Sequence, residues 1–286
     1  MEYAFEINQL SFAYSPKRGN VLHDISLKIP KGSIFGLLGP SGAGKSTTQK
    51  ILIKLLNDYQ GDVRFFGQSL NELGQAYYER IGVGFEMPVH FNKLSGYENM
   101  KFFASLYQRH IDFEKLMIRV GLGNAMHQQV GQYSKGMKMR LNFVKALLND
   151  GDVLFLDEPT NGLDPANARI LKDIILEEKA KGKTIIITTH LMGDVEELCD
   201  EVAFIANGKL LEASNPKALK LKYGVREIKV EYQEKEGLKQ HVFPMEKLAS
   251  DAFFQQLIQE DRIVTMHSQE TSLDKIFILI TGEDHA

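Results

Sequence analysis

One glycine-rich segment, Gly39 to Ser46, constrains the fold of this chain more than any other feature. It matches the pattern G-x-x-x-x-G-K-S in full, follows a short apolar run at residues 33–38 and opens a helix-compatible stretch at residues 45–56. Glycines let the backbone curve tightly, so that its N–H groups point inward at phosphate oxygens. The positive end of the helix dipole adds to this attraction. Because pattern and context agree, we interpret the segment as a phosphate-binding loop and not as an ordinary glycine-rich turn.

The side chains of this loop have distinct expected roles. Lys45 can reach the β- and γ-phosphates of a nucleotide, and the hydroxyl of Ser46 can bind Mg²⁺. Thr47 adds a second hydroxyl next to it. The residues expected to bind the nucleotide here are Gly39, Pro40, Ser41, Gly42, Ala43, Gly44, Lys45, Ser46 and Thr47.

A second apolar run, residues 153–156, ends in Asp157 and Glu158. Catalytic groups emerge at the carboxyl ends of parallel strands. Asp157 can hold Mg²⁺, and Glu158 can orient or deprotonate an attacking water. A strand followed by a solvated acidic loop is the alternative, which the upstream phosphate loop disfavours.

Strand-like and helix-like patterns alternate along the chain, which predicts an α/β fold with a P-loop NTPase core. Residues 2–10 and 21–29 resemble an antiparallel β subdomain, and residues 87–149 have helical spacing, typical of an α-helical subdomain. After Tyr223 the pattern changes to a small C-terminal α+β appendage. We therefore expect two domains, residues 1–223 and 224–286. The main expected strands are 33–38, 153–156, 184–188, 226–233 and 262–267, and the main expected helices are 45–56, 135–148, 167–181, 249–259 and 272–280.

Composition excludes several classes of protein. The formal net charge of −3 argues against a protein that coats nucleic acid by bulk charge, so we expect no nucleic-acid partner. The single cysteine, Cys199, can form neither an internal disulfide nor a cysteine-rich zinc site. No signal peptide and no apolar run of the roughly 20 residues that cross a bilayer is visible. Any membrane span would therefore belong to another chain.

A third motif narrows the class of nucleotide-binding protein to which the chain can belong. Residues 133–137, Tyr-Ser-Lys-Gly-Met, lie at the start of a predicted helix shortly before the acidic strand. With the motifs in this order, residues 3 to 220 strongly resemble the ATP-binding subunit of ABC transporters. The segment occupies the place of the family signature Leu-Ser-Gly-Gly-Gln, keeping Ser134 and Gly136 and departing at three positions. It looks like the variant found in bacterial exporter-type ATPases of the ABC-2 class. The physical alternative is a helix cap by Ser134.

The resemblance assigns four further site residues. Asp164 would belong to the loop that crosses between subunits, although an Asp cap before Pro165 explains the same pattern. His190 would be the switch histidine that senses the γ-phosphate, and Tyr14 would stack on adenine. A structural histidine and a strand-edge tyrosine are the alternatives. Glu86 replaces the usual glutamine of the loop to the helical subdomain, where its carboxylate would lie near Mg²⁺.

The resemblance implies an ATPase that uses ATP and Mg²⁺. Lys45, Glu158 and His190 would serve catalysis, Ser46, Asp157 and Glu86 would bind the metal, and Ser134 and Gly136 would cover ATP held by a second copy or a related subunit. An integral-membrane permease subunit would be the other partner, contacted near residues 86–99. The chain would lie in the cytoplasm, peripheral on the cytoplasmic face of the cell membrane. The alternative is a soluble ABC ATPase that remodels a ribosome or another assembly. A DNA-repair ATPase and an importer are further alternatives. The C-terminal segment contains no catalytic motif. The sequence does not identify the transported cargo.

Overall fold

Five short apolar strands form the parallel part of a six-stranded sheet, in the order β10-β9-β3-β8-β7-β6. All residues of β3 and β8 are buried, as expected for parallel strands that are covered on both faces. Only β10 runs antiparallel to its neighbour. The strands are β3 (Ile34–Leu38), β6 (Ile81–Gly84), β7 (Val153–Asp157), β8 (Thr184–Thr188), β9 (Glu201–Ala206) and β10 (Lys209–Ser214). Their parallel arrangement brings the segments that follow β3, β6, β7 and β8 to one edge.

A second, antiparallel sheet has the order β2-β1-β4-β5. It shares one hydrophobic core with the first sheet, because the ring of Phe5 on β1 lies 5.1 Å from Phe65 on β4 and 5.8 Å from Phe155 on β7. Ile51 and Leu52 of helix α1 are buried in the same core. The elements of this region are β1 (Tyr3–Phe12), β2 (Leu22–Pro30), α1 (Lys45–Leu52), β4 (Gln60–Phe65), β5 (Gln68–Ser69), η2 (Leu70–Glu72) and α2 (Ala76–Glu79).

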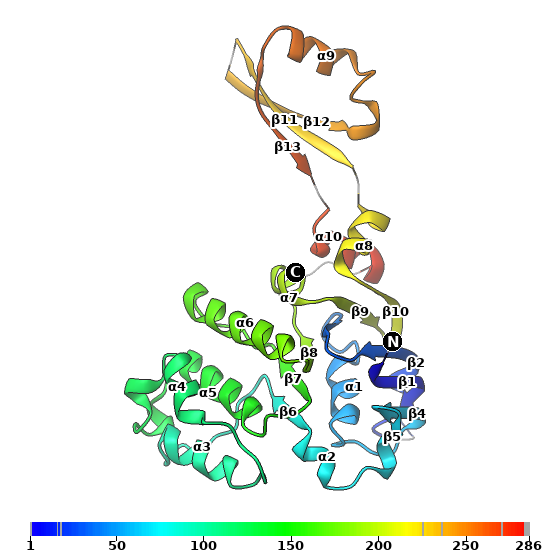
Figure 1. Cartoon of the computed structure of the whole chain (residues 1–286). Helices are drawn as coiled ribbons and strands as arrows, with labels where there is room; N and C mark the ends of the chain where they lie inside the picture. Colours follow the sequence, from blue (N-terminus) through cyan, green and yellow to red (C-terminus); the bar gives the residue numbers. More distant parts are fainter. Residues whose placement is uncertain are drawn as a thin grey trace. The chain divides into compact units, whose positions relative to one another are not determined.

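A helical subdomain connects β6 to β7 and lies beside α6 (Figure 1). Its first long helix begins with a capping box, in which Ser95 accepts from the backbone of Glu98 and Glu98 accepts from the backbone of Ser95. The elements are α3 (Gly96–Ala104), α4 (Phe113–Arg119), η3 (Gly123–Ala125), η4 (Val130–Gln132) and α5 (Lys135–Leu147). Helices α6 (Pro165–Ala180) and α7 (Met192–Leu198) follow in the α/β part.

The structure, a computed structural model, describes residues 2–15, 17, 19–224, 226–235, 237–269 and 271–282. It divides into two compact units, and the second begins at Pro216. The boundary expected from the sequence, after Tyr223, lies at the end of helix α8 (Pro216–Tyr223), which the structure assigns to the second unit. Among the described helices, none combines the length and the apolar character needed to cross a membrane.

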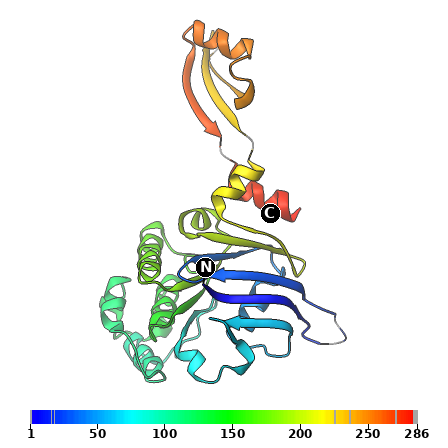
Figure 2. The same ribbon diagram turned by 45° about the vertical axis from the view of Figure 1, so that its right-hand side comes forward.

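The second unit contains an antiparallel sheet of order β12-β11-β13, with α9 on one of its faces (Figure 2). Its small core is formed by Val230, Tyr232 and Phe243 from the sheet and by Phe254 and Leu257 from α9. The elements are β11 (Glu227–Glu234), β12 (Gly237–Pro244), η5 (Met245–Lys247), α9 (Ala252–Gln259), β13 (Ile263–Gln269) and α10 (Leu273–Thr281). The predicted α/β fold with an α+β appendage is therefore confirmed, whereas strands β4, β5, β6, β9, β10 and β12 were not expected.

Candidate nucleotide site

The phosphate loop connects β3 to α1, as the sequence predicts. Gly44 precedes the helix with a φ of 110°, a conformation that disfavours residues with side chains. The ammonium of Lys45 donates hydrogen bonds to the carbonyl oxygens of Gly39 at 2.5 Å and Pro40 at 2.9 Å. Lys45 therefore lies over the loop that we expect to cradle phosphates.

Three carboxylates lie close enough to Lys45 to affect its pKa. Burial lowers the pKa of Lys45 below its ordinary value, while Glu158, Asp157 and Glu86 act in the opposite direction. These acids follow or end β7 and β6, which lie next to each other in the sheet. The fold thus brings the phosphate loop and all three predicted acids to one region.

Glu158 is the most constrained of these acids. It follows β7 with a φ of 49°, a region that residues with side chains rarely adopt, and its N–H donates to the carbonyl oxygen of Thr188 at 2.8 Å. One carboxylate oxygen, Oε1, accepts from the ring Nδ1 of His190 at 2.8 Å and from its backbone N–H at 3.1 Å. The other, Oε2, accepts from the hydroxyl of Thr189 at 3.0 Å. An unfavourable backbone conformation held in this way is typical of functional sites.

Asp157 lies at the end of β7, where its carboxylate accepts a hydrogen bond from the hydroxyl of Thr188. The two residues are register partners across the β7–β8 pair. Ser46 is exposed in the first turn of α1. The hydroxyl of Ser46 and the carboxylates of Asp157 and Glu86 are oxygen ligands of the kind that Mg²⁺ prefers, since this ion uses few protein ligands together with phosphates and water. Within the described residues, no group of three His, Cys, Asp or Glu side chains is arranged to hold a metal by itself.

Tyr14, which is expected to stack on adenine, lies beside the phosphate loop. Its hydroxyl forms a 3.1 Å hydrogen bond with the hydroxyl of Thr47, and its ring stands edge-on to Phe12 at 5.0 Å. The side chain is 53% exposed, so the ring is free on the surface next to the phosphate loop. Both features agree with the expected stacking position.

Ser134 and Asp164 both begin helices. Ser134 accepts from the backbone of Met137 at 3.2 Å at the start of α5, and Asp164 accepts from the backbone of Asn167 at 3.0 Å at the start of α6. The hydrogen bonds from Asn167 lower the pKa of Asp164. The capping roles are therefore present, and both residues are exposed, which leaves them accessible to a second chain. Gly136 is the second residue of α5, and the side chain of Leu163 lies beside it.

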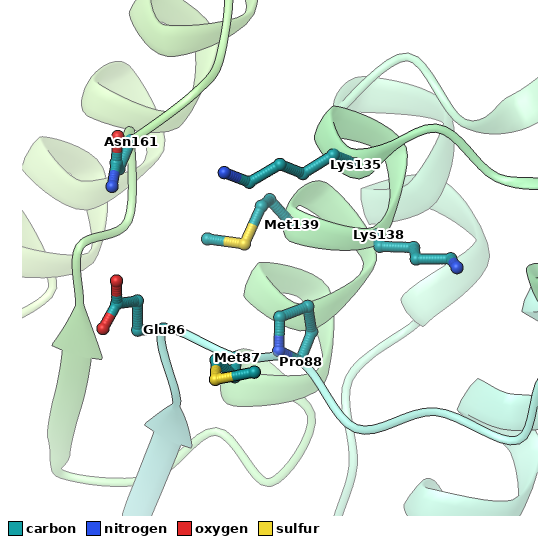
Figure 3. Close-up of a pocket in the computed structure, with 7 residues that line it drawn as sticks. All are labelled: Glu86, Met87, Pro88, Lys135, Lys138, Met139 and Asn161. Atoms are coloured by element: carbon teal, nitrogen blue, oxygen red, sulfur yellow. The ribbon is translucent and has the colours of Figure 1, made fainter.

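A cavity of about 500 Å³ lies between the start of α5 and the loops that follow β6 and β7 (Figure 3). None of its lining residues belongs to the phosphate loop. Glu86 comes from the loop after β6, and Asn161 from the loop after β7. The cavity therefore brings together three of the segments that the sequence singled out. Its lining residues are Glu86, Met87, Pro88, Lys135, Lys138, Met139 and Asn161.

Two residues of the site, Thr188 and Thr189, were missed by sequence reasoning. They hold Asp157 and Glu158, respectively. The available signal was the pair of hydroxyls at the end of the 184–188 strand, directly before the expected switch histidine.

Comparisons with known proteins agree with this geometry. The model of the ABC transporter family matches residues 22–161, and the model of the fluoroquinolone efflux ABC transporter C-terminal domain matches residues 226–270. A fluoroquinolones export ATP-binding protein of Mycobacterium tuberculosis is 48% identical over 278 residues, which cover 96% of this chain and 92% of that protein. The chain belongs to the ABC transporter ATP-binding proteins.

More distant members of the family show the same relationship over a smaller share of the chain. A lantibiotic transport ATP-binding protein of Streptococcus pyogenes is 38% identical over 207 residues, covering 72% of this chain and 88% of that protein. The solved structure of an ATP-binding subunit of an ABC transporter superposes with a TM-score of 0.71 at 28% identity, covering 77% of this chain and 93% of the other. The chain is therefore an ATPase subunit of an ABC transporter, a class that works with membrane permease components. These relatives give no support to a soluble remodelling ATPase.

Proposed function

We propose that this chain energises an ABC exporter by Mg²⁺-dependent hydrolysis of ATP at a site shared between two ATP-binding subunits. The observation that carries the proposal is the position of Glu158. Its carboxylate lies at the strand edge beside the phosphate loop and is hydrogen-bonded to His190 at 2.8 Å. Glu158 and His190 are hydrogen-bonded to each other, and Glu158 acts electrostatically on Lys45. This proximity supports roles for them as the base, the switch histidine and the phosphate-binding lysine.

ATP binding would begin with an exchange of partners at Lys45. Its ammonium would leave the carbonyl oxygens of Gly39 and Pro40 for the β- and γ-phosphates, which are stronger, charged acceptors. The backbone N–H groups of the loop would bind the phosphates, and Tyr14 would stack on the base. These contacts would hold the γ-phosphate at the edge of the sheet where the parallel strands end.

Hydrolysis would depend on Glu158 and His190. Glu158 would orient and deprotonate the attacking water, and His190 would contact the γ-phosphate and hold Glu158 in place. Ser46, Asp157 and Glu86 would hold Mg²⁺, which supplies neutralisation of the phosphate charge.

The second half of the site would come from another ATP-binding subunit. Ser134 and Gly136 at the start of α5 would cover the γ-phosphate held by the partner, and the loop that ends at Asp164 would cross between subunits. Ser134 and Asp164 are accessible for this purpose because they are exposed. Loss of the γ-phosphate would release these contacts and open the dimer.

An exposed apolar surface supports the proposed permease contact. Met87 and Val89 are 80% and 76% exposed, and the neighbouring rings of Phe91 and Phe102 lie 5.1 Å apart. Large exposed apolar residues that gather on one surface mark interaction sites. They lie in and beside the segment near residues 86–99 that was expected to contact the membrane chain. Association with that chain would place this subunit at the cytoplasmic face of the membrane.

The export direction and a cargo class are supported by a comparison that covers nearly the whole chain. The similarity to the Mycobacterium tuberculosis fluoroquinolones export protein includes both units, and the matched C-terminal model is that of fluoroquinolone efflux transporters. We therefore extend the proposal to export of drugs of the fluoroquinolone type.

A single substitution, Glu158→Gln, tests the catalytic proposal. We expect ATP binding to persist, hydrolysis to fall by about 10²–10⁴-fold and the variant to form a dimer that is stable in ATP. ATPase activity and sedimentation with ATP would be measured together. Glu72→Gln, a change of an exposed carboxylate remote from the site, is the matched control. Wild-type hydrolysis by Glu158→Gln would contradict the assignment of the base.

A pull-down of tagged Glu158→Gln protein from gently solubilised cells with ATP present tests the transport part. Recovery of a stoichiometric polytopic membrane protein is expected. Recovery of ribosomes or another soluble assembly without a membrane partner would contradict the exporter proposal. Loss of drug efflux in cells that carry Glu158→Gln would support the cargo class, and unchanged efflux would contradict it.

A further inference from the structure

A buried hydroxyl connects the loop after β7 to helix α7. Thr160 is 4% exposed and lies between Glu158 and the crossing loop that ends at Asp164. Its hydroxyl donates a hydrogen bond to Oδ2 of Asp194 on α7. Thr160 also accepts from the backbone N–H of Leu163 at 3.1 Å, which closes the loop on itself.

The second carboxylate oxygen of Asp194, Oδ1, contacts a residue of helix α6. This oxygen lies 2.5 Å from the ammonium of Lys172 on α6, and both side chains are only 14% exposed. Lys172 also contacts Glu197 at 2.6 Å. Burial lowers the pKa of Lys172, but the hydrogen bonds to Asp194 and Glu197 raise it, and the net shift is upward. The lysine therefore stays charged and holds the carboxylate in place.

We call the contacts from Thr160 to Asp194 and from Asp194 to Lys172 the link. The link joins the same two chain segments that carry Glu158 and His190. Thr160 follows Glu158 by two residues, and Asp194 follows His190 by four residues. The pair formed by the half-buried Glu158 and the exposed His190 is thus accompanied by a buried connection between the same two chain segments. Because a carboxylate with both oxygens bound has little freedom, the loop, α6 and α7 are fixed to one another.

We propose that Thr160, Asp194 and Lys172 are positioning residues that hold the crossing loop and the switch histidine in register for hydrolysis. The inference rests on the proposed roles of Glu158 and His190. Removal of the link would let the two segments move apart by a fraction of an ångström to an ångström. A displacement of this size near reacting groups lowers turnover by up to about 10²-fold. The phosphate loop and Tyr14 are not part of the link, so the affinity for ATP should be retained.

Thr160→Val tests the proposal because it removes the hydroxyl and keeps the shape of the side chain. We expect kcat to fall about ten- to a hundredfold while KM for ATP stays within about twofold. Thr160→Ser, which keeps the hydroxyl, should restore kcat. Arg169→Gln is the matched control, because Arg169 pairs with Glu197 and Asp173 at the exposed end of the same group of charges. A fall in melting temperature with unchanged kcat would overturn the proposal.

Asp194→Asn provides a second variant if Thr160→Val does not fold. It keeps a hydrogen-bonding side chain but weakens the contact with Lys172, and the same kcat loss at constant KM is expected. These variants distinguish a failure of the proposed function from a failure of the proposed positioning role. Wild-type turnover in Glu158→Gln would contradict the proposed function itself. An inactive Glu158→Gln protein together with wild-type turnover in the Thr160 and Asp194 variants would contradict only the positioning role.

Discussion

The ring Nδ1 of His190 and the carboxylate oxygen Oε1 of Glu158 are 2.8 Å apart, and the backbone N–H of His190 donates to the same oxygen at 3.1 Å. A carboxylate accepts hydrogen bonds, so Nδ1 carries the proton in this pair. In the proposed mechanism, the other ring nitrogen, Nε2, would contact the γ-phosphate. The histidine thus fixes the orientation of the acid that we propose as the base.

His190→Ala should therefore impair hydrolysis more than binding. The substitution removes the ring that holds Glu158 but leaves Lys45 and the phosphate loop intact, so we expect kcat to fall by about 10²–10⁴-fold with little change in ATP affinity. Turnover and nucleotide binding would be measured in parallel. His110→Ala, at an exposed histidine in the helical subdomain, is the control. An equal loss of binding and turnover would contradict this division of roles.

Glu86→Gln tests the effect of the acid that replaces the glutamine common in the family. Its carboxylate acts on Lys45 together with Glu158 and Asp157. Removal of one negative charge near the triphosphate should tighten ATP binding by about two- to fivefold, and salt should reduce the gain. Equilibrium binding at two ionic strengths measures this, with Glu72→Gln as the control. Weaker binding in Glu86→Gln would instead indicate that the carboxylate contributes to holding Mg²⁺.

The sequence was informative where a motif determines backbone geometry. The phosphate loop, the acidic strand end and the Ser134 and Asp164 caps could each be predicted from a few adjacent residues. Strand β6 was not predicted because it is short and contains two glycines. The structure explains Gly82 by close approach of α5: a Cβ there would lie 1.9 Å from the carbonyl oxygen of Ala146. Strand β12 was missed because its residues are mostly exposed and its apolar side chains do not alternate regularly with polar ones.

Contacts between residues that are distant in the sequence also could not be predicted. The hydrogen bond between Thr188 and Asp157 follows from their register across β7 and β8, which a single sequence does not specify. The link between Thr160 and Asp194 joins residues 34 positions apart. Neither residue belongs to a pattern that a periodicity could reveal. The chemistry of the site was therefore more predictable than the interactions that hold it.

Cys199 offers a probe of unfolding. Burial raises the pKa of its thiol to about 12. A pKa raised in the folded state means stability that is fully present below the unfolded pKa, about 8.5, and is lost as pH rises toward 12. At pH 8 we expect iodoacetamide to alkylate the native protein at least about a hundredfold more slowly than the protein in guanidinium, because the thiolate is scarce and covered. Mass spectrometry follows the modification. Comparable rates in the two states would show that Cys199 is accessible in the native protein.

Gly208 should matter for ATP binding although it lies far from the phosphate loop in sequence. Asn207 and Gly208 form the turn between β9 and β10, with φ values of 49° and 71°. The N–H of Gly208 donates to the carbonyl oxygen of Ala43 in the phosphate loop at 3.0 Å, and its own carbonyl oxygen accepts from His23 at 2.8 Å. A Cβ at this position would lie 2.1 Å from the carbonyl oxygen of Val21, so the backbone would have to shift.

Gly208→Ala is therefore expected to displace the turn from the phosphate loop and to weaken ATP binding about tenfold or more, because the loop N–H groups lose their alignment. Gly67→Ala is a matched control: its φ of 79° gives similar backbone strain, but a Cβ there would meet nothing within 4 Å. Both variants should lower the melting temperature, since a side chain is disfavoured at positive φ. Only Gly208→Ala should change the dissociation constant for ATP. A similar loss of affinity in both variants would show that general destabilisation, and not the contact with Ala43, causes the effect.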